Sequence, residues 1–316
     1  MLTFTANGEY LVSGGDEGVR VWRVKDGDRV ATMKVKDSVG SIAVSKDGRF
    51  IAAESLRDVW VWDATTYEQI FAGHNESHSF IHDVDFSPDS SHLVSADGGE
   101  HTATIWEIAA RRKVRTLDHG QCVYAAKYSP QGGRIATASD ESIRVWDSDD
   151  GRLLVNVKVG LSPWCGLLWF NNHLFAKTKD SKIGRINAST GSTVSEWSVP
   201  HDYDSRIALP QHGQFLAYST KDNITFWDTS TRTQLGLISR STSDCSIAFS
   251  PSGQHLALVR QRKIIIKDVS GVKVCHPLNM LPILICTSYT RSQTFVLKTL
   301  RSMRGKIINS PMRRHC

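Results

Sequence analysis

The sequence lacks the long apolar segments and helical patterns of membrane and α-rich proteins. The longest apolar run, Met280 to Cys286, is interrupted by Pro282 and is far shorter than the roughly 20 residues that cross a bilayer. No cationic segment followed by an apolar core marks a secretory signal at the N-terminus. No stretch has the length and 3.6-residue period of a helix. We therefore expect a soluble, mainly β protein in the cytoplasm or nucleus.

Cysteine is sparse, and it never occurs in the paired spacing of metal or redox motifs. None of the 6 cysteines forms a Cys-x-x-Cys pair. Disulfide frameworks belong mainly to small secreted domains. We interpret the cysteines as small buried side chains in a reducing compartment.

Catalytic signatures are missing as well. The sequence has no phosphate-binding Gly-rich loop, no Gly-x-Ser-x-Gly elbow and no pair of carboxylates at helical spacing. His74, His78 and His82 follow one another at four-residue spacing, but on a strand this spacing spreads them over about 13 Å, too far to share one ion. We therefore predict no enzymatic activity, no metal and no cofactor.

What the sequence does contain is a unit of about forty residues that recurs seven times and ends in an apolar strand. The closing positions of these units are Trp22, Trp62, Trp106, Trp146, Ile186, Trp227 and Lys267. They are spaced 40, 44, 40, 40, 41 and 40 residues apart. A strand end followed by a turn, such as Phe86-Ser87-Pro88-Asp89, repeats in step with them. Two signals with one period predict an array of β-sheet units.

These residues resemble the WD-repeat β-propeller family over roughly residues 1–278. The pairs Gly73-His74 and Asp118-His119, and acids such as Asp140 six residues before the closing Trp, add to the resemblance. It implies an all-β fold, a seven-bladed propeller. Only Met1 to Phe4 remain for the innermost strand of the first blade, so we expect that blade to be truncated, or the chain to be part of a longer protein. We hypothesise that Ile283–Tyr289 pairs there and closes the ring.

The charge of the chain is concentrated after the repeats. Residues 279–316 contain 7 Lys or Arg and no acid. Because the whole chain carries +6, residues 1–278 are left at −1. The tail is interpreted as an exposed, partly disordered extension or a closing strand. Basic residues also bind nucleic acid, but the absence of interleaved stacking aromatics speaks against that role.

The resemblance also implies a hydrogen-bond chain inside the fourth blade. In the family such a chain runs from an indole through a hydroxyl and an imidazole to a carboxylate, which matches Trp146, Thr137, His119 and Asp140. Buried indole, imidazole and carboxylate groups each require a partner, and a linked network supplies all of them. We interpret these residues as structural and not as a hydrolase triad.

The family binds its partners on the face formed by the loops between blades and the loops between second and third strands. Mapped onto this chain, the resemblance gives six candidate partner-binding residues: Trp164, Tyr203, Phe80, Arg57, Arg262 and His78. Trp, Tyr and Arg supply the strongest contacts at interfaces. Trp164 is the preferred anchor, and burial between the fourth and fifth blades is its alternative.

We therefore predict a non-catalytic scaffold, a monomeric propeller within a complex, that presents these loops to a protein or peptide partner. One alternative is association with nucleic acid through the basic tail. The other is a sensor module, a fragment of a larger signalling ATPase.

Overall fold

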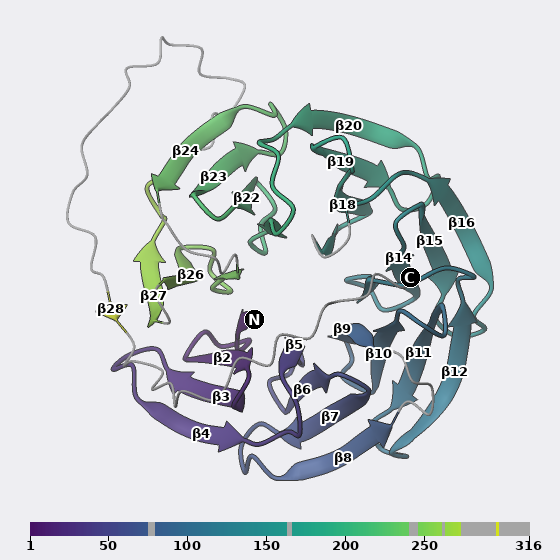
Figure 1. Cartoon of the computed structure of the whole chain (residues 1–316), viewed down its shortest axis with the longest axis vertical. Coiled ribbons are helices and arrows are strands. Elements are labelled where there is room, and N and C mark those ends of the chain that lie inside the picture. The colour runs from purple at the N-terminus through teal and green to yellow at the C-terminus, as the bar shows by residue number, and fades with distance from the viewer. Residues whose placement is uncertain (75–79, 163–165, 240–245, 261–262, 273–294, 297–316) are drawn as a thin grey trace, which may run out of the picture.

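The strands form seven antiparallel sheets of four strands each. The computed structural model describes residues 1–74, 80–162, 166–239, 246–260, 263–272 and 295–296. These residues contain no helix, and so none that is long and apolar enough to cross a membrane. The sheets surround a central axis as the blades of a propeller (Figure 1). The predicted all-β, seven-bladed fold is confirmed.

Each blade takes its four strands from consecutive parts of the chain, ordered from the axis outward. Blade 1 contains β1 (Leu2–Phe4), β2 (Tyr10–Gly15), β3 (Gly18–Arg23) and β4 (Arg29–Met33). Blade 2 contains β5 (Val39–Val44), β6 (Phe50–Ser55), β7 (Asp58–Asp63) and β8 (Gln69–His74). Blade 3 contains β9 (Ile81–Phe86), β10 (His92–Asp97), β11 (Thr102–Glu107) and β12 (Arg112–Asp118). Blade 4 contains β13 (Ala125–Tyr128), β14 (Arg134–Ala138), β15 (Ser142–Asp147) and β16 (Leu153–Lys158).

The remaining blades follow the same plan. Blade 5 contains β17 (Leu167–Phe170), β18 (His173–Lys177), β19 (Lys182–Asn187) and β20 (Thr193–Ser198). Blade 6 contains β21 (Arg206–Ala208), β22 (Phe215–Ser219), β23 (Asn223–Asp228) and β24 (Gln234–Ser239). Blade 7 contains β25 (Ile247–Phe249), β26 (His255–Arg260), β27 (Lys263–Asp268) and β28 (Phe295–Val296).

The seven closing positions all lie on the third strand of their blades. In blades 1 to 6 the pairing of the third strand with the fourth shifts by one residue immediately before the closing residue. Such bulges bend the strand and increase its twist. The sequence repeat therefore marks one recurring point of the blade, the bulge between the third and the outermost strand.

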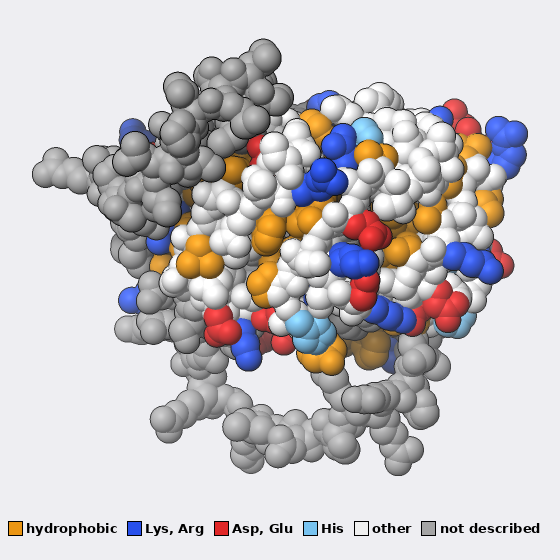
Figure 2. Space-filling model, turned by 90° about the horizontal axis from the view of Figure 1, so that it is seen from above, with side chains coloured by type: hydrophobic (Ala, Val, Ile, Leu, Met, Phe, Trp, Pro, Cys, Tyr) orange, Lys and Arg blue, Asp and Glu red, His pale blue; other side chains and the backbone are white. Residues whose placement is uncertain are grey.

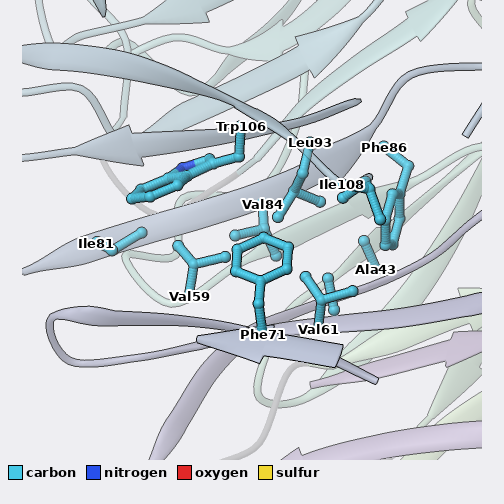
Figure 3. Close-up of a cluster of buried hydrophobic side chains, with 11 residues drawn as sticks. Ala43, Val59, Val61, Phe71, Ile81, Val84, Phe86, Leu93, Trp106 and Ile108 are labelled. Atoms are coloured by element: carbon cyan, nitrogen blue, oxygen red, sulfur yellow. The ribbon is translucent and has the colours of Figure 1, made fainter. Parts of the chain in front are cut away.

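The closing Trp of a blade packs against the blade before it. Trp106 of blade 3 shares a buried cluster with Val59, Val61 and Phe71 of blade 2 (Figure 3). The ring centroids of Phe71 and Trp106 are 6.4 Å apart. Trp62 lies in a cluster with Val19 of blade 1, among others. A unit of this size cannot bury its own sheet face, so the blades stabilise each other in pairs.

This packing explains the glycine of the Gly73-His74 pair. A Cβ atom on Gly73 would stand 2.5 Å from Cζ3 of Trp106. We expect Gly73→Ala to destabilise the fold by about 1–3 kcal/mol through overpacking, measured by urea unfolding. Gly236 is the matched control because it also lies on an outermost strand, with nothing within 4 Å of its added Cβ. Equal stability of the two alanine variants would contradict the packing argument.

Blades 1 and 7 close the ring by side-chain packing. Trp22, Leu2 and Phe4 of blade 1 form one buried cluster with residues of blade 7, including Val259 and Ile264. The amino group of Met1 donates to the carbonyl of Gly14 at 2.9 Å. The innermost strand of blade 1 has 3 residues, as have β21 and β25. The innermost strand of blade 1 is short, as predicted, but the sheet of this blade still has four strands.

The tail contributes one described element. Phe295–Val296 pairs antiparallel with Ile265 and Ile266 of β27 and is the outermost strand of blade 7. The proposed closing segment, Ile283–Tyr289, lies outside the described residues.

Candidate partner-binding site

The loops expected to bind a partner lie on one face of the ring. The innermost strand of each blade pairs antiparallel with the second strand. The loop that enters the innermost strand and the turn that leaves the second strand are therefore at the same end of the blade. We call this end of all blades the docking face. The turns that leave the innermost strands lie on the opposite face.

Tyr203 is the most exposed large hydrophobic side chain in the described part of the chain, at 77%. It lies in the loop between blades 5 and 6, where its ring meets that of His201 edge-on at 4.7 Å. His201 Nδ1 in turn lies 2.7 Å from the hydroxyl of Ser181. The structure thus places Tyr203 at the surface, where the sequence predicted it.

Hydrogen bonds from both neighbouring blades hold this loop in place. The buried Lys177 of blade 5 donates from Nζ to the carbonyl of Asp202 at 2.6 Å. Tyr218 of blade 6 donates from its hydroxyl to the carbonyl of Pro200 at 2.6 Å, and the backbone N–H of Lys221 donates to Asp202 Oδ2 at 3.1 Å. The loop is therefore a fixed support for an exposed aromatic ring.

Phe80 occupies the equivalent loop before blade 3 and is 52% exposed. Its carbonyl accepts a hydrogen bond from the N–H of Gly98 at 3.0 Å. The N–H of the next residue, Ile81, donates to the carbonyl of Leu56 in blade 2 at 2.7 Å. Leu56 is itself 38% exposed, and the adjacent Arg57 is partly buried. Phe80 and the turn of Leu56 and Arg57 are thus joined across two blades.

Trp164, Arg262 and His78 lie outside the described residues. The choice between exposure and burial for Trp164 stays a prediction.

The fourth blade contains part of the predicted hydrogen-bond chain. The indole Nε1 of Trp146 donates to Thr137 Oγ1 at 2.8 Å. The ring of His119 is fully buried at 6.5 Å from the Trp146 ring, but neither of its nitrogens has a hydrogen-bond partner in normal geometry among the described residues. Burial, aided by the charge of Arg144, lowers the pKa of His119 to about 4. The ring is therefore neutral at pH 7.

Asp140 does not complete that chain. Its carboxylate lies 3.4 Å from Nζ of Lys179, in a pair whose two side chains are 39% and 53% exposed. The turn that holds Asp140 places its carboxylate beside Lys179 of the next blade, and no hydrogen bond joins it to His119 among the described residues. Of the four predicted residues, Trp146 and Thr137 are hydrogen-bonded, the ring of His119 lies beside Trp146, and Asp140 pairs with Lys179.

The sequence reasoning missed a cluster of charged groups where β6 of blade 2 meets the innermost strands of blades 3 and 4, β9 and β13. We call Glu54, Asp83, Asp85 and Lys127 the inner charge cluster. Lys127 Nζ lies 3.0 Å from Asp83 Oδ1 and 2.9 Å from Asp83 Oδ2. The hydroxyl of Ser41 donates to Asp83 Oδ1 at 2.9 Å.

Two carboxylates of β9 also accept backbone hydrogen bonds from the next blade. The N–H of Ala126 donates to Asp83 Oδ2 at 3.2 Å, and the N–H of Tyr128 donates to Asp85 Oδ2 at 2.9 Å. These bonds connect β13 to β9, although the two strands belong to different sheets. Burial raises the pKa of Asp85 to about 6, although Lys127 and the Tyr128 N–H oppose this.

Glu54 is the most deeply buried acid of the inner charge cluster, at 3% exposure. Burial and, second, the charge of Asp83 raise its pKa to about 8, although the N–H groups of Ser41 and Gly40 favour the charged form. Glu54 is therefore largely protonated at neutral pH.

We expect Glu54→Gln to change how stability depends on pH. The folded pKa of about 8 lies above the ordinary value for Glu, so the folded state binds the extra proton and loses stability as the pH rises from about 4.5 to 8. Gln imitates the protonated carboxyl and removes that loss. The variant should gain on the order of 2 kcal/mol relative to wild type between pH 5 and 8. Urea unfolding across this range tests it; parallel pH profiles would contradict the shifted pKa.

Cys122 departs from the expectation for the cysteines. It is buried, at 7% exposure, as expected, but it is disulfide-bonded, and its partner lies outside the described residues. The expectation that every cysteine is reduced is wrong for Cys122 in this structure. Because disulfides persist mainly in oxidising compartments, the redox state of Cys122 in cells tests the expected cytoplasmic or nuclear location.

The histidine run considered for a metal is divided between two blades. His74 Nδ1 lies 2.5 Å from Asp58 Oδ1 on β7, whereas His82 stacks on Tyr124 of blade 4 at 5.4 Å. No group of three or more His, Cys, Asp or Glu among the described residues is arranged to hold a metal ion.

Comparison with known proteins agrees with this architecture. The family described as WD domain, G-beta repeat matches residues 2–23, 65–107 and 111–147. Apoptotic protease-activating factor 1 of Mus musculus is 26% identical over 236 residues, which are 69% of this chain and 19% of that protein. WD repeat-containing protein 1 of Gallus gallus is 24% identical over 244 residues, which are 73% of this chain and 40% of that protein.

A shorter match has higher identity. Small ribosomal subunit protein RACK1 of Glycine max is 30% identical over 90 residues, 28% of this chain and 26% of that protein. The chain thus spans less than half the length of each of these three relatives. With seven four-stranded blades in a ring and a closing Trp in five of them, the chain is a WD-repeat β-propeller.

Proposed function

We propose that this propeller is a docking platform that binds a protein or peptide partner through its docking face. WD-repeat propellers are generally non-catalytic scaffolds for protein interactions. In this chain the scaffold would hold Tyr203 and Phe80 as the aromatic anchors of the contact, and Arg57, in the turn joined to the Phe80 loop, would add a charged contact.

The observation that carries the proposal is the exposure of two large aromatic side chains on anchored loops of one face. Tyr203 is 77% and Phe80 52% exposed, although burial of each in an interface would be favourable. Aromatic residues that end in a desolvated pocket of a partner supply much of the binding free energy. Loops that are already fixed lose little conformational freedom on binding, which favours affinity.

Leu56 supports the same face. It has a positive φ of 53°, which is uncommon for a bulky residue, and its side chain is 38% exposed. The same conformation recurs at His101 and Ser181 in the corresponding turns of blades 3 and 5, so it belongs to the turn. The feature that distinguishes this turn is its exposed apolar side chain close to Phe80.

The two alternatives receive less support. Identity to apoptotic protease-activating factor 1, at 26%, is similar to that for WD repeat-containing proteins 18 and 1, at 27% and 24%. The matches therefore do not favour a signalling sensor over other propellers. Nucleic-acid binding would rest on the basic tail, of which the structure describes only residues 295 and 296.

Site-specific photo-crosslinking tests the docking face. Benzoylphenylalanine is introduced at position 203 and, as a control, at position 194 of β20, where Val194 is 49% exposed on the outer edge of blade 5. We expect a defined protein adduct from position 203 in extract of the source cell, and none of that mass from position 194. Adding Phe80→Ala to the position-203 protein should abolish the adduct.

Equal adducts from both positions, or an adduct that Phe80→Ala leaves unchanged, would refute the proposed face. Recovery of nucleic acid that is lost at high salt and after deletion of residues 297–316 would support the tail alternative instead.

A further inference from the structure

A cavity of about 500 Å³ lies between blades 3 and 4. Pro88 and Asp89 line it from the turn that leaves β9, and Gln131 and Gly132 from the turn that leaves β13. Both turns belong to the opposite face, because Phe80 precedes β9 whereas Pro88 follows it. The cavity is within the size range of small-ligand sites, and it is remote from the docking face.

The wall of the cavity combines polar side chains with an apolar part that is firmly packed. Ile105 is 2% and Tyr128 7% exposed, and Pro88 has a fixed ring. Gly132 lies against this ring: its φ is +87°, and an added Cβ would be in ordinary contact with Pro88 Cδ, at 3.5 Å. These walls suit an aliphatic stem, and the Tyr128 ring offers an aromatic surface to a cation.

Two carboxylates stand beside the Tyr128 ring. Burial raises the pKa of Tyr128, and the charges of Asp85, Asp89 and Asp149 raise it further. Asp89 and Asp149 both line the cavity. Asp89 accepts three hydrogen bonds from Ser87 and Ser91, and a carboxylate has about four acceptor sites. Asp149 is exposed and accepts one long bond, from Ser148 at 3.4 Å.

Arg115, the one Lys or Arg among the described residues that line the cavity, already donates to two backbone carbonyls. Arg115 donates from Nη1 to the carbonyl of Asp150 at 2.8 Å and from Nη2 to the carbonyl of Asp149 at 2.7 Å. Its planar fork thereby occupies the two adjacent carbonyls that would suit a second guanidinium. The charged acceptors that remain among the lining residues are the carboxylates of Asp89 and Asp149. Asp89 retains about one acceptor site, which is enough for one N–H of a compact ammonium but not for the two parallel bonds of a guanidinium.

We propose that this cavity binds the side chain of a lysine from a partner protein, with its stem between Pro88, Ile105 and Tyr128 and its ammonium at Asp89 and Asp149. The site is separate from the docking face and does not depend on the function proposed for it. It gives the propeller a second contact, on the opposite face, for a lysine-bearing segment.

The experiment uses small probes, the full chain and methyl NMR. Nα-acetyl-lysine methylamide is titrated against protein with labelled Ile, Leu and Val methyl groups, with the norleucine and arginine analogues as matched probes. We expect saturable shifts at Ile105 and Val114 with the lysine probe, weakened by added salt. The norleucine probe should bind at least tenfold more weakly because it lacks the charge, and the arginine probe weaker than lysine.

Two variants locate the charge. Asp149→Asn should weaken the lysine probe about tenfold; since Asp149 is exposed, this variant should retain its fold, which the unperturbed methyl spectrum will verify. Asp222→Asn, an exposed acid in the β22–β23 turn of the docking face, should leave binding unchanged. Absence of shifts at Ile105 and Val114, equal binding of norleucine, tighter binding of arginine, or binding insensitive to Asp149→Asn would overturn the proposal.

Discussion

Replacing Lys127 with Met is expected to destabilise the propeller by about 3 kcal/mol, the lower end of the range for breaking a buried ion pair. The variant keeps the length of the side chain but leaves Asp83 and Asp85 without their cation. Burial alone would lower the pKa of Lys127, but the charges of Asp83 and Asp85 raise it above its ordinary value. The lower end applies because the Lys127 side chain retains 23% exposure and that of Asp83 13%.

Lys179→Met is the matched control. Lys179 pairs with Asp140 at 3.4 Å, but the two side chains are 53% and 39% exposed, so the loss should stay below about 1 kcal/mol. Urea unfolding compares Lys127→Met with Lys179→Met. The same measurement on Asp83→Asn and on Asp83→Asn/Lys127→Met completes the cycle that gives the coupling of Asp83 and Lys127. Removal of both partners should cost less than the sum of the single changes. A Lys127→Met protein as stable as wild type would show that the inner charge cluster contributes nothing.

Trp22→Ala is expected to destabilise the protein by about 3–5 kcal/mol, as usual for truncating a buried Trp. Trp22 is 4% exposed and fills the cluster in which blades 1 and 7 meet. Its indole Nε1 also donates to Ser13 Oγ at 2.8 Å. Hydrogen exchange should accelerate in β1 and in β25 to β27, because the first and last blades would separate before the rest unfolds.

Trp146→Ala is the control for Trp22→Ala, because it truncates a closing Trp between two blades that are consecutive in the chain. Trp146 is 6% exposed and packs against blade 3, which the chain joins directly to blade 4. A similar loss of stability is expected there, but with faster exchange confined to blades 3 and 4. If Trp22→Ala leaves hydrogen exchange in blade 7 unchanged, the contact between blades 1 and 7 does not depend on Trp22.

The fold was predictable because one residue per unit has one structural role. The closing Trp recurs with the period of the blade, and each copy lies in the contact with the preceding blade, as for Trp62 and Trp106. Two copies lack it. Ile186 is still buried in a cluster with blade 4, whereas Lys267 is partly exposed. The period therefore survives where the aromatic residue does not.

The inner charge cluster could not be predicted from the sequence, because its members come from different blades and meet only in the folded ring. Asp83 and Asp85 alternate with Val84 along β9, a pattern that reads as a strand with one solvated face. Their partner Lys127 is more than forty residues away, and only the ring brings it close. An acid in the innermost strand, where acids are depleted, was the available signal. Exposure of Tyr203 and Phe80, by contrast, followed from their place in loops.

The outermost strands form the edge of the ring. Viewed from the side, hydrophobic side chains are interspersed with charged ones (Figure 2). Exposed apolar residues such as Leu153, Val194 and Leu237 are on outermost strands, singly or as a neighbouring pair. Isolated exposed hydrophobic residues are normal on soluble proteins, so the two faces remain the places to look for partners.

The packing of each Trp against the preceding blade has a consequence for biosynthesis. Trp106 and Trp146 emerge from the ribosome after the blades that receive them, but Trp22 must wait for blade 7. More than 200 residues separate Trp22 from Ala248 in its cluster. At the usual 5–20 residues per second, the first indole stays uncovered for roughly 10–45 s. A nascent chain of this protein thus offers chaperones, or aggregation, an aromatic target until the last blade is translated.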